Sequence, residues 1–378
     1  MTPTPQRTLA GRLRAAQLGF PLILALASVP VLAQQTSLSP EKRGRFGEVV
    51  SRFMYAHSVP GISAAVVQNG KGVWSEGFGV ADMENFVPAT PSTLYRLGSI
   101  SKSITAVAVM QLWEHGKLDL DAPVQKYCPA FPQKEYAITT RQLLGHLGGI
   151  RHYHPDGKGD VPDDSARHFA SMQESLQLFA NDPLVAKPGT EFHYSTYGYT
   201  LLGCVLEGAA SQKYMTYVHD NVLAPAGMYD TQADNFFAVI QHRTRWYHKD
   251  KSDVVRNAGV LDSSYKTPGG GLISSADDMA KFAAAMLAGT LVKPATRDLM
   301  WTVLKPTEGK PSHYGLGWFV TDKFGLHLVG HDGGQQGTST AMTLAPERRA
   351  GVIVLANMDS INTNQLAEEM LLVLLETR

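Results

Sequence analysis

The two ends of the chain carry the clearest pattern of apolar and polar positions. Ser39-Pro40 predicts the start of a helix, with serine as the N-cap and proline in the first turn, and this helix runs to about His57. Strand-like runs at 62–68 and 71–79 then flank Asn69-Gly70, a dipeptide typical of a two-residue hairpin turn. Near the other end lie three more strand-like runs and a final apolar helix: 325–330, 338–344, 350–356 and 361–377.

The middle of the chain, up to about residue 290, predicts mostly helices and long loops. Residues 99–115 have a helical pattern that ends at Gly116, and 154–165, rich in Gly, Pro and Asp, are expected to form a mobile loop. We therefore predict an α+β fold for residues 38–378, in which both ends contribute to one antiparallel sheet flanked by the terminal helices. The sheet lobe is expected at about 38–95 and 290–378 and a helical lobe at about 96–289, with a small-molecule site in the cleft between them.

Residues 1–33 stand apart and have the features of a secretory signal peptide. Arg7, Arg12 and Arg14 precede an apolar stretch that closes with the small-residue pattern Val31-Leu32-Ala33. This segment predicts an exported protein, periplasmic or secreted, with no stable membrane span after cleavage. The alternatives are an uncleaved anchor and, in a eukaryote, a mitochondrial transit peptide, although a transit peptide should be amphipathic and this segment is apolar on all sides.

Composition narrows the class of protein. The 378 residues include 34 Lys and Arg against 34 Asp and Glu, so zero net charge without basic runs gives no electrostatic footprint for nucleic acid. The hydrophobic share of 44% suits a large folded core. Cys128 and Cys204 are the only cysteines. They could pair in an oxidising compartment, but Cys204 lies in an apolar run typical of a buried free cysteine, so we assign no disulfide.

The pattern Ser-x-x-Lys occurs three times, and only one copy has a setting that points to chemistry. Ser39/Lys42 starts the first helix and Ser263/Lys266 lies in a loop, whereas Ser99/Lys102 opens a helix that is apolar around its whole circumference. Residues three apart share a helix face, so the hydroxyl and the amine can meet. A buried lysine in the first helical turn is costly to ionise, which lowers its pKa and favours the neutral amine that activates a serine. The alternative is a serine N-cap beside a lysine that extends to solvent.

Two later segments strengthen the chemical interpretation. Tyr194 lies just before an apolar helix, and Gly330–Gly337 links two strand-like runs with enough glycine for a close backbone approach to a ligand. These segments, together with others in the same order, resemble the serine β-lactamase and penicillin-binding-protein superfamily. The resemblance is greatest to its class C-type β-lactamase-related serine hydrolases, which include the serine β-lactamase-like proteins of mitochondria. The other matching stretches are 97–102, 117–121, 138–144, 192–200 and 269–275.

The resemblance implies a role for each matching residue. Ser99 would be the nucleophile that forms an acyl-enzyme, Lys102 the proton acceptor or its electrostatic helper, and Tyr194 the group that carries the proton between serine and leaving group. The backbone N–H groups of Ser99 and Gly334 would form the oxyanion hole. The residues that would line the substrate are Thr196, His331, Asp332 and Gly333.

Two departures from the family pattern bear on the substrate. Thr196 stands where the family often has asparagine, which loses the paired donor and acceptor of an amide, and His331 replaces a permanently charged lysine. We therefore expect a peptidase or esterase that acts on a small-molecule or short-peptide substrate. The alternatives are a β-lactamase or D,D-peptidase acting on cell-wall peptides, and a penicillin-binding protein without efficient turnover. The oligomeric state stays open.

The remaining conspicuous residues point to no cofactor. His146, His152 and His154 lie close together, but no Cys or Glu completes a metal-binding spacing, so we expect no metal. The family places a loop near the active site here, where Tyr153 or His154 would contact substrate. The glycines at 269–271 are interpreted as points of close backbone approach, because no Gly-Lys-Ser/Thr phosphate-binding pattern follows them.

Overall fold

The fold is that of a computed structural model, which describes residues 38–154, 160–162 and 165–376. The expected signal peptide, 1–33, and the centre of the expected mobile loop lie outside these ranges. None of the helices in the described ranges is both long and apolar enough to span a membrane.

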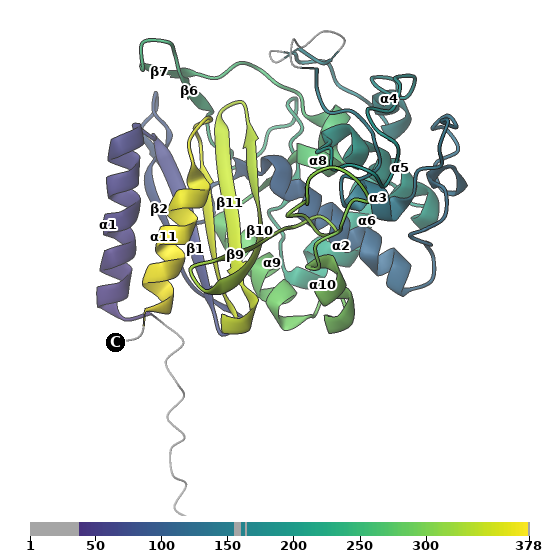
Figure 1. The fold of residues 1–378 in the computed structure, drawn as a ribbon. Helices are drawn as coiled ribbons and strands as arrows, with labels where there is room; N and C mark the ends of the chain where they lie inside the picture. Colours follow the sequence, from purple (N-terminus) through teal and green to yellow (C-terminus); the bar gives the residue numbers. More distant parts are fainter. Residues whose placement is uncertain (1–37, 155–159, 163–164, 377–378) are drawn as a thin grey trace, which may run out of the picture. The chain divides into compact units, whose positions relative to one another are not determined.

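A seven-stranded antiparallel sheet joins the two ends of the chain, in the order β3-β2-β1-β12-β11-β10-β9 (Figure 1). At its centre β1 pairs with β12, so that Ile62 lies opposite Ala356, which confirms the predicted joint sheet. The β1–β2 hairpin turns at Asn69 and Gly70, with φ of +55° and +73°, as the Asn-Gly signal predicts. The strands are β1 Gly61–Gln68, β2 Lys71–Asp82, β3 Val87–Pro88, β9 Phe319–Lys323, β10 Leu326–Gln335, β11 Thr338–Ala345 and β12 Ala350–Ala356.

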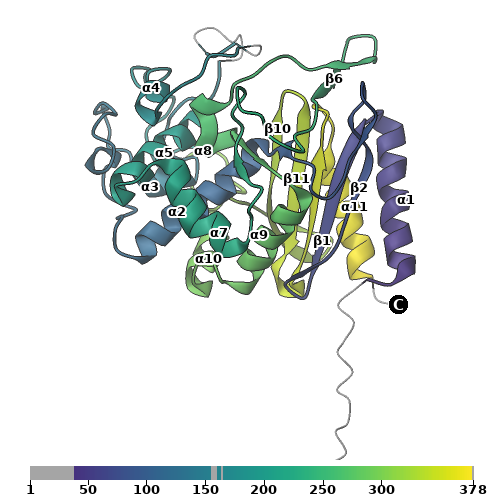
Figure 2. The same ribbon diagram turned by 180° about the vertical axis from the view of Figure 1, so that it is seen from behind.

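Helices cover both faces of this sheet (Figure 2). On one face lie the terminal helices α1 (Pro40–His57) and α11 (Thr363–Leu375), and on the other lies α9 (Ala276–Ala288). Because side chains alternate along a strand, Val66 of β1 packs towards α1 and α11 while Val67 joins the larger core on the other side. Helix α9 thus packs on the sheet, although its residues fall in the range expected for the helical lobe.

The rest of the chain forms the predicted region of helices and loops, built around the buried helix α2. Its helices are α2 Ser101–Glu114, α3 Thr140–Leu144, α4 Met172–Leu176, α5 Thr196–Ala210, α6 Tyr214–Val218, α7 Ala224–Ala226, α8 Thr267–Gly270 and α10 Pro294–Met300, with a π-helical turn His219–Leu223. Short 3₁₀ turns occur at Gly98–Ile100 (η1), Val124–Lys126, Ser264–Lys266 and Pro346–Arg348. Two small sheets contain β4 Tyr95–Arg96, β8 Leu272–Ser274 and β5 Gln232–Ala233, and β6 Tyr247–Lys249 with β7 Val255–Asn257.

The assignment of no disulfide is wrong: Cys128 and Cys204 are bonded to each other. Their Cα atoms lie 5.5 Å apart, within the range that a disulfide requires. Gly208, one turn beyond Cys204 on α5, allows this approach, because a Cβ there would lie 1.7 Å from the carbonyl oxygen of Tyr127. The apolar run around Cys204 describes its own helix and carries no information about a partner 76 residues away.

Candidate active site

The predicted nucleophile Ser99 lies in η1, where the chain passes from β4 into α2. Gly98 has φ +52°, and a Cβ at this position would lie 2.9 Å from the backbone nitrogen of Gly334. Glycine therefore permits both the left-handed turn and its close packing on β10. The Thr340 hydroxyl donates to the Leu97 carbonyl at 2.8 Å and ties the turn to the sheet.

The amine of Lys102 lies within hydrogen-bond distance of three oxygen atoms. These are Ser99 Oγ at 3.0 Å, Thr196 Oγ1 at 3.1 Å and the Gly269 carbonyl at 2.6 Å. The side chain is fully buried. Burial, with a smaller effect from the charge of Lys266, lowers the pKa of Lys102 well below its ordinary value. The lysine is thereby displaced towards its neutral form, the direction expected from the sequence.

Tyr194 completes the contact between the three predicted catalytic groups. Its phenol interacts with the Ser99 side chain, and Lys102 Nζ lies 4.8 Å from the centre of the Tyr194 ring. Burial raises the pKa of the Tyr194 phenol, and its interaction with Ser99 opposes this shift. The fold thus brings together a serine and a lysine at the start of α2 and a tyrosine from the segment before α5.

The open edge of β10 faces this turn. Strand β9 pairs with β10 only up to Gly330. Among the residues that the structure describes, no strand pairs with segment 331–335 of β10 on that side. A Cβ on Gly333 would lie 2.0 Å from the Leu97 carbonyl oxygen, which shows how closely the two backbones approach. The predicted oxyanion-hole residues, Ser99 and Gly334, therefore come from adjacent segments.

The histidine of the β10 motif lies inside the protein and not on its surface. His331 Nδ1 lies 2.6 Å from the Asp332 carbonyl, which can only accept, so Nδ1 carries the hydrogen. Nε2 then accepts from the Tyr314 hydroxyl at 2.8 Å. Burial, with a smaller contribution from the Lys102 charge, lowers the pKa of His331 to about 3. The residue is therefore a neutral neighbour of the site.

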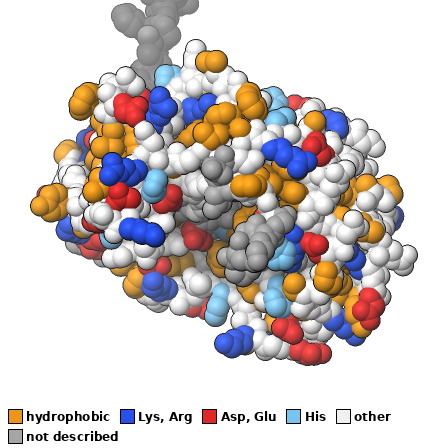
Figure 3. Space-filling view, turned by 90° about the horizontal axis from the view of Figure 1, so that it is seen from above, with side chains coloured by type: hydrophobic (Ala, Val, Ile, Leu, Met, Phe, Trp, Pro, Cys, Tyr) orange, Lys and Arg blue, Asp and Glu red, His pale blue; other side chains and the backbone are white. Residues whose placement is uncertain are grey.

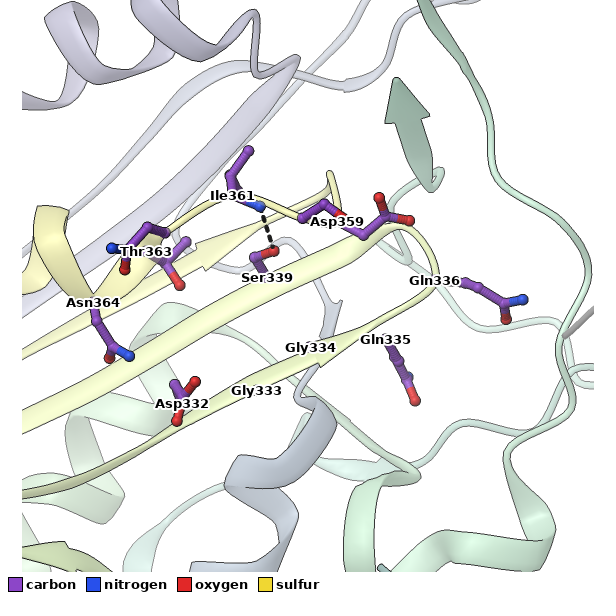
Figure 4. A pocket seen from close by; sticks show the side chains of 12 residues that line it. Asp332, Gly333, Gly334, Gln335, Gln336, Ser339, Asp359, Ile361, Thr363 and Asn364 are labelled. Carbon is purple, nitrogen blue, oxygen red and sulfur yellow. Dashed lines mark hydrogen bonds between the residues drawn. The ribbon is translucent and has the colours of Figure 1, made fainter. Parts of the chain in front are cut away.

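The other predicted substrate residues have two kinds of surroundings. Thr196 is buried and its hydroxyl contacts Lys102. Asp332 is partly exposed and faces Asn364 at the start of α11 (Figure 4), while partial burial raises the pKa of its carboxyl. Its negative charge acts on Lys102 in the direction that raises the lysine pKa, opposing the effect of burial.

A polar pocket of about 470 Å³ adjoins the β10 edge (Figure 4). Asp332 and Asn364 face one another across it, and the Ser339 hydroxyl of β11 accepts from the Ile361 N–H at 3.3 Å. Besides these residues, the lining contains the two motif glycines, a second carboxylate and several amides: Gly333, Gly334, Gln335, Gln336, Asp359, Ser360, Asn362 and Thr363. The pocket thus offers polar, uncharged and acidic groups beside the predicted oxyanion position.

Two participants in the site were not predicted. Lys266 belongs to the Ser-x-x-Lys copy assigned to a loop, yet it is buried and its charge acts on Lys102. Gly269 was interpreted as a point of close approach, and a Cβ there would indeed lie 2.8 Å from Thr196 Cγ2, but its carbonyl also accepts from the Lys102 amine. The only signal for either was the unusual Lys-Thr-Pro-Gly-Gly-Gly sequence.

The histidine cluster shows no metal-binding arrangement. In the described parts of the chain, no group of three or more His, Cys, Asp or Glu side chains could hold a metal ion. His146 and His152 instead contact the segment that carries Tyr194, and the Tyr153 ring stacks on His152 with centroids 4.3 Å apart. His154 is exposed, and its backbone N–H donates to Asp160 at 2.5 Å.

Comparison with known sequences agrees with this geometry. The sequence profile of the Beta-lactamase family matches residues 46–375. The mitochondrial serine beta-lactamase-like protein LACTB of Mus musculus is 36% identical over 417 residues, covering 82% of this chain and 76% of that protein. Protein flp of Staphylococcus aureus (strain N315) is 27% identical, covering 89% of this chain and 67% of its own.

Solved structures with the same fold include binding proteins and enzymes. The octameric penicillin-binding protein homologue from Pyrococcus abyssi has a TM-score of 0.77 at 30% identity and covers 88% of this chain and 77% of its own. The D-amino acid amidase from Ochrobactrum anthropi, at 23% identity, has a TM-score of 0.77 and covers 88% and 98%. With the matched profile and the LACTB relatives, these findings show that the chain belongs to the Beta-lactamase family.

Proposed function

We propose that this protein is an exported serine hydrolase that cleaves an amide or ester through an acyl-enzyme on Ser99. The observation that carries the proposal is the joint contact of Ser99 with the Lys102 amine and the Tyr194 phenol. A serine hydroxyl is a weak nucleophile, and a neighbouring base is what activates it.

The three partners of Lys102 suit both protonation states of its amine. A neutral amine has two N–H groups and one lone pair. The Gly269 carbonyl accepts one hydrogen, the Thr196 hydroxyl accepts the other, and the lone pair is left for the proton of Ser99. After transfer, the ammonium donates to the same three oxygens, so the proton moves without rearrangement of the site.

The proposed reaction then has two halves. Ser99 Oγ bonds to the substrate carbonyl carbon as its proton passes to Lys102, and the N–H groups of Ser99 and Gly334 stabilise the oxyanion. The C–N or C–O bond breaks as the leaving group takes a proton through Tyr194. Water then attacks the acyl carbon and gives a proton back towards Ser99, which releases the acid.

The surroundings support a peptidase or esterase in preference to a β-lactamase. His331 is neutral and bound to Tyr314, so it offers no fixed positive charge to a substrate carboxylate. The polar pocket beside Gly334 carries no weight in this choice, because Ser99, Lys102 and Tyr194 are not among the residues that line it. Figure 3 shows charged side chains of both signs interspersed on one face of the protein.

Two alternatives are favoured by particular relatives. The penicillin-binding protein homologue favours recognition of cell-wall peptides or β-lactams, with or without efficient turnover. The mitochondrial LACTB proteins favour a mitochondrial location if the chain is eukaryotic, whereas the Arg-containing apolar segment 1–33 favours export. The N-terminal residue of the protein isolated from its source cell shows whether segment 1–33 is removed and where it is cleaved.

Intact-protein mass spectrometry tests the proposal. The protein is treated with a fluorophosphonate and with a panel of β-lactams, acyl esters and peptides. We expect an adduct on Ser99 that is lost in Ser99→Ala and kept in Ser39→Ala, which changes the serine of another Ser-x-x-Lys copy. Labelling that persists in Ser99→Ala would reject the assignment. Rapid release of cephalosporin products would favour the β-lactamase alternative.

A further inference from the structure

Two histidines outside the proposed proton path lie beside Tyr194. His146 Nδ1 accepts from the backbone N–H of Ser195 at 3.1 Å, and the His146 carbonyl accepts from the N–H of His193 at 2.9 Å. Both backbone N–H groups that flank Tyr194 therefore bind to one residue. The His146 ring also packs against the Tyr194 ring, with centroids 4.3 Å apart.

His152 makes the equivalent contact one residue further on. Its Nδ1 accepts from the Thr196 N–H at 3.2 Å, and its ring meets the Tyr194 ring edge-on, with centroids 5.6 Å apart. Thr196 is the residue whose hydroxyl binds Lys102. The two histidines thus hold the backbone that presents one partner to Ser99 and another to Lys102.

Both rings must be neutral to do this, because a protonated Nδ1 cannot accept. Burial, with a smaller effect from the charge of Lys102, lowers the pKa of both, that of His152 to about 4. The position of His146 is otherwise unfavourable. Its φ is +60°, which is uncommon for a non-glycine residue, and its buried Nε2 has no hydrogen-bond partner among the residues that the structure describes. Such costs are typical of residues kept for a site.

We propose that His146 and His152 are positioning residues, which hold 193–196 so that the Tyr194 phenol reaches Ser99 and the Thr196 hydroxyl reaches Lys102. This inference rests on the proposed function, since it assigns the histidines a task in the same reaction. Loss of either acceptor frees the backbone beside Tyr194, and small displacements of a reacting group are costly in rate.

The decisive comparison is between His146→Leu and His146→Asn. Leucine removes the acceptor, whereas asparagine places Oδ1 near the former position of Nδ1 and tolerates positive φ. With an acyl ester as substrate, we expect kcat to fall about 10- to 100-fold in His146→Leu with KM almost unchanged, and to recover most of that loss in His146→Asn. His327→Leu, on the exposed part of β10, is the control and should keep the wild-type kcat. Equal losses in the leucine and asparagine variants would overturn the proposal.

A double-mutant cycle separates positioning from a general loss of structure. If His146 acts through Tyr194, then His146→Leu introduced into Tyr194→Phe should reduce kcat by less than about 3-fold. The full loss in both backgrounds would contradict this. Should His146→Leu fail to fold, as judged by its thermal melt, His152→Leu and His152→Asn provide the same comparison at a less buried ring.

The proposed function and the positioning role fail in different ways. If the wild-type protein forms no fluorophosphonate adduct on Ser99, the proposed hydrolase activity is refuted. If the adduct forms normally and the effects in the His146/Tyr194 double-mutant cycle are additive, the hydrolase proposal stands and only the positioning role of the histidines is refuted.

Discussion

The starts of α1 and α2 carry the same Ser-x-x-Lys spacing with opposite outcomes. In α1, the Ser39 hydroxyl caps the helix by accepting from the Lys42 backbone N–H, and Lys42 Nζ donates to the carbonyls of Leu374 and Glu376 at the end of α11. This lysine supplies positive charge where a helix C-terminus favours it. The pair is therefore a stabilising structural element.

In α2 the same spacing is used differently because η1 precedes the helix. Ile100, without a side-chain cap, holds the N-cap position, so the Ser99 hydroxyl is available to Lys102 and Tyr194. Lys102 is fully buried on the same stretch of chain. The difference shows that the spacing brings the two side chains together, while burial and the use of the hydroxyl decide whether the pair can be reactive.

The largest difference between the two pairs is expected on removal of the amine. Lys102→Met should reduce kcat/KM by close to 10⁴-fold, the upper end for a general acid–base group, because Ser99 loses its proton acceptor. Lys42→Met should leave kcat/KM unchanged. The measurement is steady-state hydrolysis of an acyl ester, and near-normal kinetics in Lys102→Met would show that the amine is not in the proton path.

The tyrosine contact exists only at the α2 pair, and its removal tests that distinction. Tyr194→Phe keeps the ring but removes the hydroxyl, so kcat should fall by about 10²- to 10⁴-fold. Tyr55→Phe, an exposed tyrosine on α1, serves as the matched control. A variant at 194 with wild-type kcat would restrict the mechanism to Ser99 and Lys102.

The neighbouring charge of Lys266 gives a pH test. Activity that depends on the neutral form of Lys102 is present above the pKa of the lysine and is lost as pH falls through it. Since Lys266 lowers this pKa, Lys266→Gln should raise it and move the acid limb of the kcat/KM profile to higher pH. An unchanged acid limb in Lys266→Gln, with Lys251→Gln at an exposed lysine as the control, would contradict this role.

The smallest effect concerns stability at the α1 pair. Ser39→Ala removes a helix cap and should lower the free energy of unfolding by about 1 kcal/mol, with no change in kcat. Urea denaturation measures the first quantity and ester hydrolysis the second. A loss of activity beyond the change in folded fraction would show that α1 acts on the site.

Local features were predictable because neighbouring residues determine them. The Ser39 cap, the Asn69-Gly70 turn, the end of α2 at Gly116 and the shared helix face of Ser99 and Lys102 each depend on a few consecutive residues. The joint sheet was also predictable, because strand patterns at both ends have few compact arrangements other than pairing with each other.

Features that depend on distant segments were not predictable from such patterns. Neither the bond between Cys128 and Cys204 nor the binding of the Gly269 carbonyl to Lys102 leaves a periodic signal, since each joins elements far apart in sequence. His146 and His152 gave an ambiguous signal for the same reason. Their spacing resembles a metal-binding cluster, and only the folded backbone shows that their lone pairs are occupied by Ser195 and Thr196.

By itself, then, the sequence determined which serine and lysine meet, because a helix places residues three apart on one face whatever surrounds it. The tertiary structure decided that the lysine of this pair is buried, that a tyrosine reaches it, and that the β10 histidine is neutral. Burial and hydrogen bonding set the pKa of an ionisable group, and both are properties of the packed chain, not of its neighbours in sequence.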